Sequence, residues 1–149
     1  MPVKVLKADK QTELEIIKIF NEYAELCKKK DVQGCLDLFA SGPDTLGLGS
    51  EEGERAIGRE DLRLFFERAF SRPLEYTFEW RWFQISQSES VAWATAEGLI
   101  HTDSRNQGRT STSYRMTAVF VRRDSAWLWS QLHGSVGVEP YEGKKFKAQ

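Results

Sequence analysis

The 149-residue chain has the length of one ordinary domain, and its net charge of −1 lacks the basic excess typical of nucleic-acid-binding proteins. No apolar run approaches the roughly 20 residues that span a bilayer, and residues 1–7 are too short and too charged for a signal peptide. We therefore expect a cytoplasmic protein without nucleic-acid or membrane partners.

The first half of the chain has the apolar spacing of helices. Residues 12–30 place apolar side chains at steps of three and four, and Asp31 can cap a second helix over 32–39. A third amphipathic stretch covers residues 59–71, and a short strand is predicted at 45–49. This half therefore predicts three helices around one short strand.

The second half changes to the two-residue period of strands. Aromatic and polar residues alternate from 76 to 82, and strand-like segments follow at 91–101, 110–122 and 127–135, separated by polar turns. Four consecutive strands joined by tight turns predict an antiparallel meander. Helices that precede strands in this way indicate an α+β fold.

The last predicted strand carries the clearest functional signal. Strand alternation places five of its side chains on one face: Trp127, Trp129, Gln131, His133 and Ser135. Two aromatic rings followed by hydrogen-bonding groups are typical of a partly apolar cavity wall rather than of a plain core. We therefore expect a pocket beside this strand.

Three segments resemble the SnoaL-like domains of the nuclear transport factor 2-like superfamily, which are related in fold to ketosteroid isomerase. The first runs from Tyr23 to Ala40 and contains Asp31-Val32 and Leu38-Phe39-Ala40. The second is Ile57-Gly58-Arg59-Glu60-Asp61-Leu62. The third is Arg115-Met116-Thr117, followed in the next strand by Trp127 and by Gln131-Leu132-His133-Gly134-Ser135. The resemblance implies a cone-shaped fold, in which N-terminal helices pack on a curved, mainly antiparallel sheet. It also implies a pocket at the wide end, a homodimer formed through the outer sheet face, and one domain over 1–149. The core of this domain would cover about 12–138, with a short flexible tail at 139–149.

The isomerases of this superfamily use three polar groups, of which the sequence offers one. Tyr23 matches the tyrosine that hydrogen-bonds the developing enolate. The matching position for the carboxylate base falls near Leu48, and no aspartate occurs at 115–118, where a second donor would lie. A tyrosine alone does not remove a proton from carbon, so we do not expect steroid isomerisation by that mechanism.

Polar residues expected on the pocket wall form the candidate site. His133 would be the acid or base and Tyr23 the donor if the protein is an enzyme, although His133 could instead fix the strand register. Arg115 offers a planar fork for a ligand carboxylate, and its alternative partner is Glu97 on the neighbouring strand. The remaining candidates for ligand contact are Gln131, Thr117, Trp129 and Trp80.

Motifs for metals, cofactors and nucleophiles are not recognised in the sequence. Two cysteines and two histidines at unrelated spacings make no metal-ligand pattern, so neither a metal nor another cofactor is expected. Glycines at 47–53 have the wrong spacing for a dinucleotide loop and predict a flexible acidic loop at the pocket mouth. A Ser–His–acid set cannot be placed, and His101 is expected at a strand end or rim.

Two functions remain open from the sequence. The first is a pocket for a mainly apolar small molecule with a carbonyl or carboxylate, with acid–base chemistry of the isomerase, cyclase or hydratase kind. The second is a non-catalytic dimerisation or protein-interaction module whose own side chains plug the pocket. The small residues Ala92, Ala94, Ala96 and Gly98 favour the second, because they would let another layer approach one strand face closely. The same row could equally be covered by a symmetric homodimer partner, which would leave both functions open.

Overall fold

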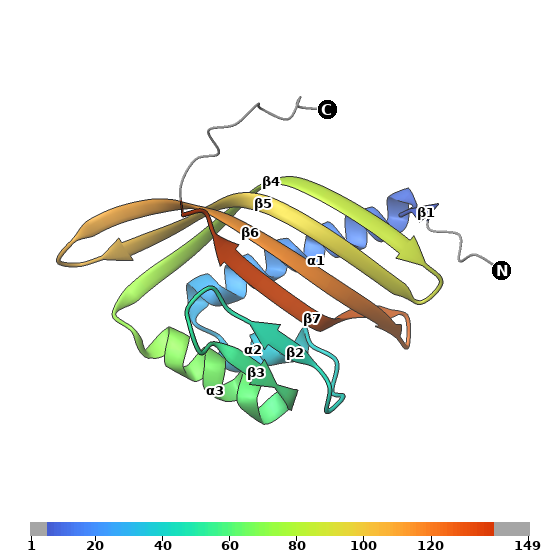
Figure 1. The fold of residues 1–149 in the computed structure, drawn as a ribbon, viewed down its shortest axis with the longest axis horizontal. Coiled ribbons are helices and arrows are strands. Elements are labelled where there is room, and N and C mark those ends of the chain that lie inside the picture. The colour runs from blue at the N-terminus through green and yellow to red at the C-terminus, as the bar shows by residue number, and fades with distance from the viewer. Residues whose placement is uncertain (1–5, 139–149) are drawn as a thin grey trace.

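The computed structural model describes residues 6–138, and the predicted tail at 139–149 lies outside them. Figure 1 shows the arrangement of the helices and strands. In chain order they are β1 (Leu6–Lys7), α1 (Lys10–Lys29), α2 (Val32–Asp37), β2 (Leu46–Leu48), β3 (Arg55–Ile57), α3 (Gly58–Ser71), β4 (Leu74–Ser88), β5 (Val91–Ser104), β6 (Gly108–Arg123) and β7 (Ala126–Val136).

The three predicted helices are confirmed, with ends that shift by one or two residues. Asp9 caps α1, and its carboxylate accepts the backbone N–H of Thr12 at 2.8 Å. Asp31 caps α2 as expected, accepting the backbone N–H of Gly34 at 2.9 Å. Each cap satisfies an N–H that has no partner inside its own helix.

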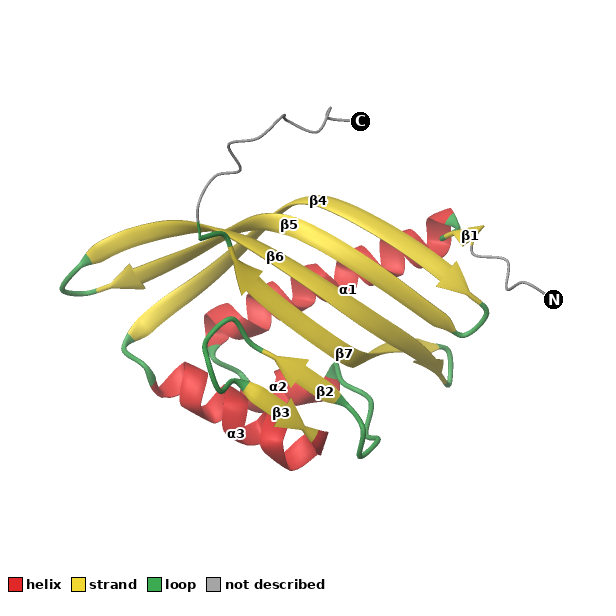
Figure 2. Cartoon of the chain, viewed as in Figure 1, coloured by secondary structure: helices red, strands yellow, loops and turns green. Residues whose placement is uncertain are grey.

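The predicted meander is also confirmed. Within the described chain the strands form one sheet in the order β1-β4-β5-β6-β7-β2-β3, in which β4 to β7 pair antiparallel and β2 runs parallel to β7. Figure 2 shows this curved sheet with α1 behind its long strands and α2 and α3 below it. Helices followed by a curved, mainly antiparallel sheet give the expected α+β cone; the short strands β1 and β3 were not predicted.

Aromatic rings fill the space between α1 and the inner sheet face. Phe20 of α1 is fully buried, and its ring centroid lies 5.3–5.9 Å from those of four other rings: Trp80, Phe83, Phe120 and Trp129. The row Ala92, Ala94 and Ala96 is buried in the same core. The expectation that this row forms an open docking face is therefore wrong, because its small side chains make room for the rings instead.

A bulge in β7 reverses the faces of that strand halfway along. Val119 pairs with Gln131 but the next residue, Phe120, pairs with Trp129, so Ser130 is an extra residue. Trp129 therefore points inward together with Leu132, whereas His133 points outward. The prediction that Trp129, Gln131 and His133 share one face is wrong for this reason.

A second bulge lies in β4. The pairing with β5 shifts between Trp80 and Trp82, which leaves Arg81 as the extra residue. Trp80 points into the core, where its indole Nε1 donates to the Phe20 carbonyl at 3.3 Å, while Trp82 is 46% exposed. These two tryptophans therefore lie on opposite faces of the sheet, contrary to the two-residue period of the sequence.

Candidate functional site

A cavity of about 120 Å³ opens between α1, α3, the β2–β3 loop and strands β4 to β6. Its buried lining is mostly aromatic and comprises Tyr23, Cys27, Phe66 and Tyr114. Four charged residues, Glu51, Glu54, Arg68 and Arg72, line its more exposed part. The site therefore has an apolar interior and a charged mouth.

Two tyrosine hydroxyls supply hydrogen-bonding groups inside this cavity. Burial raises the pKa of Tyr23 on α1 well above its usual value of 10.0, and the neighbouring Cys27 thiol and Tyr114 hydroxyl raise this pKa further. Burial likewise raises the pKa of Tyr114 on β6, with smaller contributions from Cys27 and Glu54. Both phenols therefore stay neutral at physiological pH and keep a hydrogen to donate.

Gly134 on β7 determines where the Tyr114 hydroxyl can lie. A Cβ atom built at Gly134 would overlap the hydroxyl of Tyr114, which lies on the neighbouring strand. Any other residue at position 134 would displace the phenol from its place in the cavity wall. The glycine in this predicted motif thus has a role in packing a site residue.

The acidic loop at 49–54 lies at the cavity mouth, as predicted. Glu51 accepts two hydrogen bonds from the Arg72 guanidinium, both at 2.8 Å, and these bonds lower the pKa of Glu51. Glu54 accepts the Glu51 backbone N–H at 2.8 Å through Oε1. Gly49 leaves room for the Glu54 side chain, because a Cβ at position 49 would lie 2.7 Å from Glu54 Oε1.

The chain matches the model of one known protein family. The family model of the SnoaL-like domain matches residues 16–139. The chain belongs to the SnoaL-like domain family. No curated protein was found that matches the chain.

Solved structures share the fold at low sequence identity. An NTF2-like protein of unknown function from Pseudomonas putida KT2440 superposes with a TM-score of 0.73 at 16% identity, covering 95% of each chain. A protein from Catenulispora acidiphila, solved in complex with S-DNPA, gives 0.75 at 19% identity, covering 86% of this chain and 95% of that one. A protein of unknown function from Nostoc punctiforme gives 0.71 at 20% identity, covering 89% and 96%. These likenesses concern the fold alone.

Of the residues predicted for the site, Tyr23 alone lines the cavity. Trp80 and Trp129 lie in the core, and Trp129 is fully buried with an indole Nε1 that has no hydrogen-bond partner among the described residues. The polar candidates Arg115, Thr117, Glu97, Gln131 and His133 are exposed on the outer sheet face. The prediction that these five side chains face one cavity with Trp129 is wrong.

The position of Arg115 follows from strand alternation on β6. Tyr114, Met116 and Ala118 are buried on the inner face, so Arg115 and Thr117 must point outward. Arg115 is the direct cross-strand neighbour of Glu97, yet no ion pair joins them within the described residues.

Sequence reasoning missed Tyr114 and Glu54 as cavity residues. The signal for Tyr114 was present, because it alternates in phase with the apolar Met116 and Ala118. Glu54 belongs to the loop that was predicted correctly, but the turn geometry decides that Glu51 and Glu54 line the cavity and Glu52 does not.

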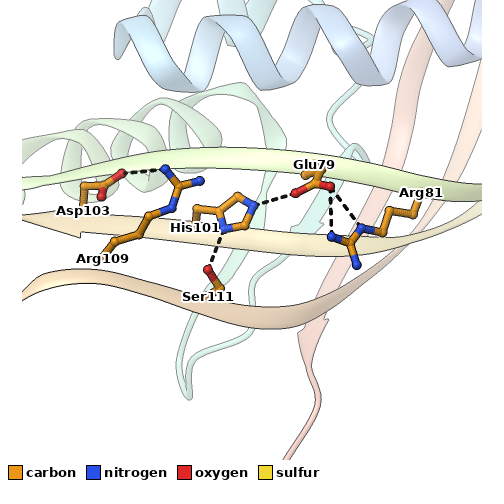
Figure 3. Close-up of polar contacts among 6 residues, drawn as sticks. All are labelled: Glu79, Arg81, His101, Asp103, Arg109 and Ser111. Atoms are coloured by element: carbon orange, nitrogen blue, oxygen red, sulfur yellow. Dashed lines mark hydrogen bonds and ion pairs between the residues drawn. The ribbon is translucent and has the colours of Figure 1, made fainter.

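A Ser–His–acid set does exist in the described chain, although none was predicted. His101 is 8% exposed rather than a rim residue, and its two ring nitrogens contact Ser111 and Glu79 on the outer sheet face (Figure 3). The three residues come from three neighbouring strands and are far apart in sequence. This set lies on the opposite face of the sheet from the cavity.

Residues 6–138 lack two kinds of feature, a metal-binding cluster and a membrane-spanning helix. They contain no cluster of three or more His, Cys, Asp or Glu side chains arranged to hold a metal ion. Among the described helices, none has the length and apolar character needed to cross a membrane.

Proposed function

We propose that this chain binds a small, mainly apolar compound that carries a carbonyl or carboxylate oxygen, inside the cavity bounded by Tyr23 and Tyr114. The observation that carries the proposal is the pair of neutral tyrosine hydroxyls buried in an aromatic cavity. A phenol hydroxyl in the wall of an apolar cavity can donate to a ligand oxygen, and such a hydrogen bond is stronger there than in water. The complex of the Catenulispora acidiphila protein with S-DNPA is consistent with small-molecule binding by this fold.

The size of the cavity limits what it can enclose. An engineered apolar cavity of about 150 Å³ in another protein binds benzene, so a volume of about 120 Å³ accepts one small ring or a short branched chain. The rest of a larger ligand would extend to the charged mouth between the β2–β3 loop and α3. An open cavity also favours this function over an interaction module with a plugged pocket.

The reaction that best fits these groups is proton transfer beside the carbonyl. Glu54 lines the cavity, and its Oε2 has no hydrogen bond to the loop that holds Oε1. In this proposal Glu54 takes a proton from the carbon next to the carbonyl, while Tyr23 and Tyr114 donate to the enolate oxygen. The proton then returns to carbon from Glu54. Glu54 replaces His133, which lies outside the cavity, as the proposed base.

A matched pair of probes tests the binding proposal. Acetophenone and ethylbenzene are of similar size, but acetophenone alone has a carbonyl oxygen. NMR titration should show that acetophenone binds more tightly, and Tyr23→Phe or Tyr114→Phe should weaken its binding by about fivefold, the worth of roughly one hydrogen bond. Ethylbenzene affinity should not change. Equal loss for both probes would contradict the role of the hydroxyls.

Deuterium exchange tests the chemical step separately. In D₂O the methyl protons of bound acetophenone should exchange faster with the wild-type protein than with Glu54→Gln. Glu52→Gln is the matched control, because Glu52 is an exposed acid of the same loop that does not line the cavity. Equal exchange rates in the wild type and in Glu54→Gln would contradict the role of Glu54 as the base, and the binding proposal would stand without this chemical step.

The outer sheet face favours a second property, a homodimer formed through the part of that face around Trp82, Glu97 and Arg115. No helix lies in front of the long strands in Figure 1, and this face exposes 46% of Trp82. It also presents Glu97 beside Arg115, so a twofold axis would bring an acid of one copy to a base of the other. Light scattering should then give a dimer for the wild type and a monomer for Trp82→Glu. A monomeric wild type would contradict this proposal.

A further inference from the structure

Ser111, His101 and Glu79 form a continuous chain of hydrogen bonds across β6, β5 and β4 (Figure 3). The Ser111 hydroxyl lies 2.7 Å from His101 Nδ1, and His101 Nε2 lies 2.8 Å from Glu79 Oε2. His101 pairs directly with Ser111 and with Thr77 in the sheet, and Glu79 follows Thr77 by two residues on the same face. The register of three strands therefore fixes this arrangement.

The neighbours of the imidazole determine how it is protonated. Hydrogen bonds from His101 and Arg81 lower the pKa of Glu79, so this carboxylate is ionised and can only accept. Nε2 of His101 must then carry a hydrogen, which leaves Nδ1 of the neutral ring to accept the Ser111 hydroxyl. A nucleophile, a base and an acid that orients the base follow one another in this order.

Ser111 is exposed, and the pairing of β6 shows which side of the strand its backbone faces. The carbonyl of Ser113 accepts from the Gly137 N–H at 3.2 Å, so the backbone of Ser113 faces the β7 side, as does that of Ser111 two residues earlier. β7 ends at Val136, opposite Tyr114, and no other described strand pairs with β6 beside Ser111. Among the described residues no strand covers this side of Ser111, so its N–H can donate to an oxyanion formed on its own side chain.

We propose that Ser111 is a reactive nucleophile that takes an acyl group from an activated ester. The Ser111 oxygen forms a bond to the acyl carbon, its proton passes to His101 Nδ1, and the bond from carbon to the leaving alkoxide breaks. The alkoxide takes up the proton, which leaves an acyl ester on Ser111 and a neutral His101. This site lies on the outer sheet face and is independent of the cavity and its ligand.

p-Nitrophenyl acetate tests the proposal, with release of p-nitrophenol followed by absorbance and the acetyl group located by peptide mass spectrometry. The wild-type protein should carry the acetyl group on Ser111, and Ser111→Ala should remove the fast phase of release. Ser113→Ala is the matched control, because Ser113 is exposed on the same face two residues away, whereas the ring nitrogens of His101 bond to Ser111 and Glu79. This control should react like the wild type.

Glu79→Gln and His101→Gln test the base and its orientation. Acetylation of Ser111 should slow by at least about a hundredfold in His101→Gln, the usual worth of a general base, and by a smaller factor in Glu79→Gln. Because His101 is buried, circular dichroism must first show that its variant folds; the exposed Ser111→Ala decides the question if it does not. Acetylation confined to lysines, or equal rates in Ser111→Ala and Ser113→Ala, would overturn the proposal.

Discussion

The two faces of the long strands differ in almost every property, although they belong to the same residues in alternation. The inner face packs aromatic rings around Phe20 and ends in a cavity with two neutral tyrosines. None of the described helices covers the outer face, which holds exposed charges, an exposed tryptophan and the His101 hydrogen-bond chain. A single extra residue in a strand is enough to move a side chain from one environment to the other.

The largest expected effect concerns the centre of the inner face. Phe20→Ala should lower the free energy of unfolding by about 3–5 kcal/mol, because the ring is fully buried among four others and its loss leaves a cavity. Urea denaturation followed by tryptophan fluorescence measures the change. A loss below about 1 kcal/mol would show that Phe20 is not the centre of the core.

A smaller loss of stability is expected from a substitution at Gly134, where β7 packs against Tyr114 of β6. Gly134→Ala should lower the free energy of unfolding by about 1–3 kcal/mol, because the added methyl group overlaps the Tyr114 hydroxyl. Tyr114→Phe removes that hydroxyl, so the double variant should recover part of the loss. Simple additivity of the two changes in a double-mutant cycle would contradict the proposed contact.

The ion pair at the cavity mouth should produce a modest dependence on pH. Arg72 lowers the pKa of Glu51 below its usual value of 4.5, so the pair stabilises the fold above that pH. The stabilisation disappears as the pH falls through the lowered pKa. Because both side chains are partly exposed, Arg72→Gln should cost less than about 1 kcal/mol at pH 7.

The corresponding measurement compares thermal unfolding of the wild type and Arg72→Gln between neutral and acidic pH. The two proteins should converge in stability as the solution becomes acidic. Arg55→Gln is the control, because the exposed Arg55 makes no ion pair with any described residue and its effect on stability should not depend on pH. A difference between wild type and Arg72→Gln that persists undiminished in acid would show that Arg72 acts by other means.

The smallest expected effect lies on the outer face. His133→Ala should change the free energy of unfolding by no more than about 0.5 kcal/mol and leave acetophenone binding unchanged, because His133 is exposed and does not line the cavity. Chemical denaturation and NMR titration of the variant measure both quantities. Loss of ligand binding in this variant would return His133 to the candidate site.

Periodicity predicted most of the fold but only part of the site. The helix stripes, the Asp31 cap and the four long strands are local patterns, and each is confirmed. The bulges at Arg81 and Ser130 have no local signature, because one extra residue leaves the composition of the strand unchanged. They reverse the face of the residues beyond them, which is why His133 does not share a face with Trp129, nor Trp82 with Trp80.

Long-range register explains the remaining differences. His101, Ser111 and Glu79 meet because β4, β5 and β6 pair at particular residues, and no short motif encodes that pairing. Tyr23 was found because a family resemblance identified its position on α1. Tyr114 required the strand parity of β6, which Met116 and Ala118 would have supplied.

The central claim is that a small carbonyl compound binds within the cone against Tyr23 and Tyr114. Intermolecular nuclear Overhauser effects between acetophenone and the aromatic protons of the labelled protein test it most directly. The account predicts contacts from the ligand to Tyr23, Phe78 and Tyr114, all of which line the cavity. Contacts confined to Trp82 on the outer face, or no contacts at a ligand concentration that saturates the titration, would contradict it.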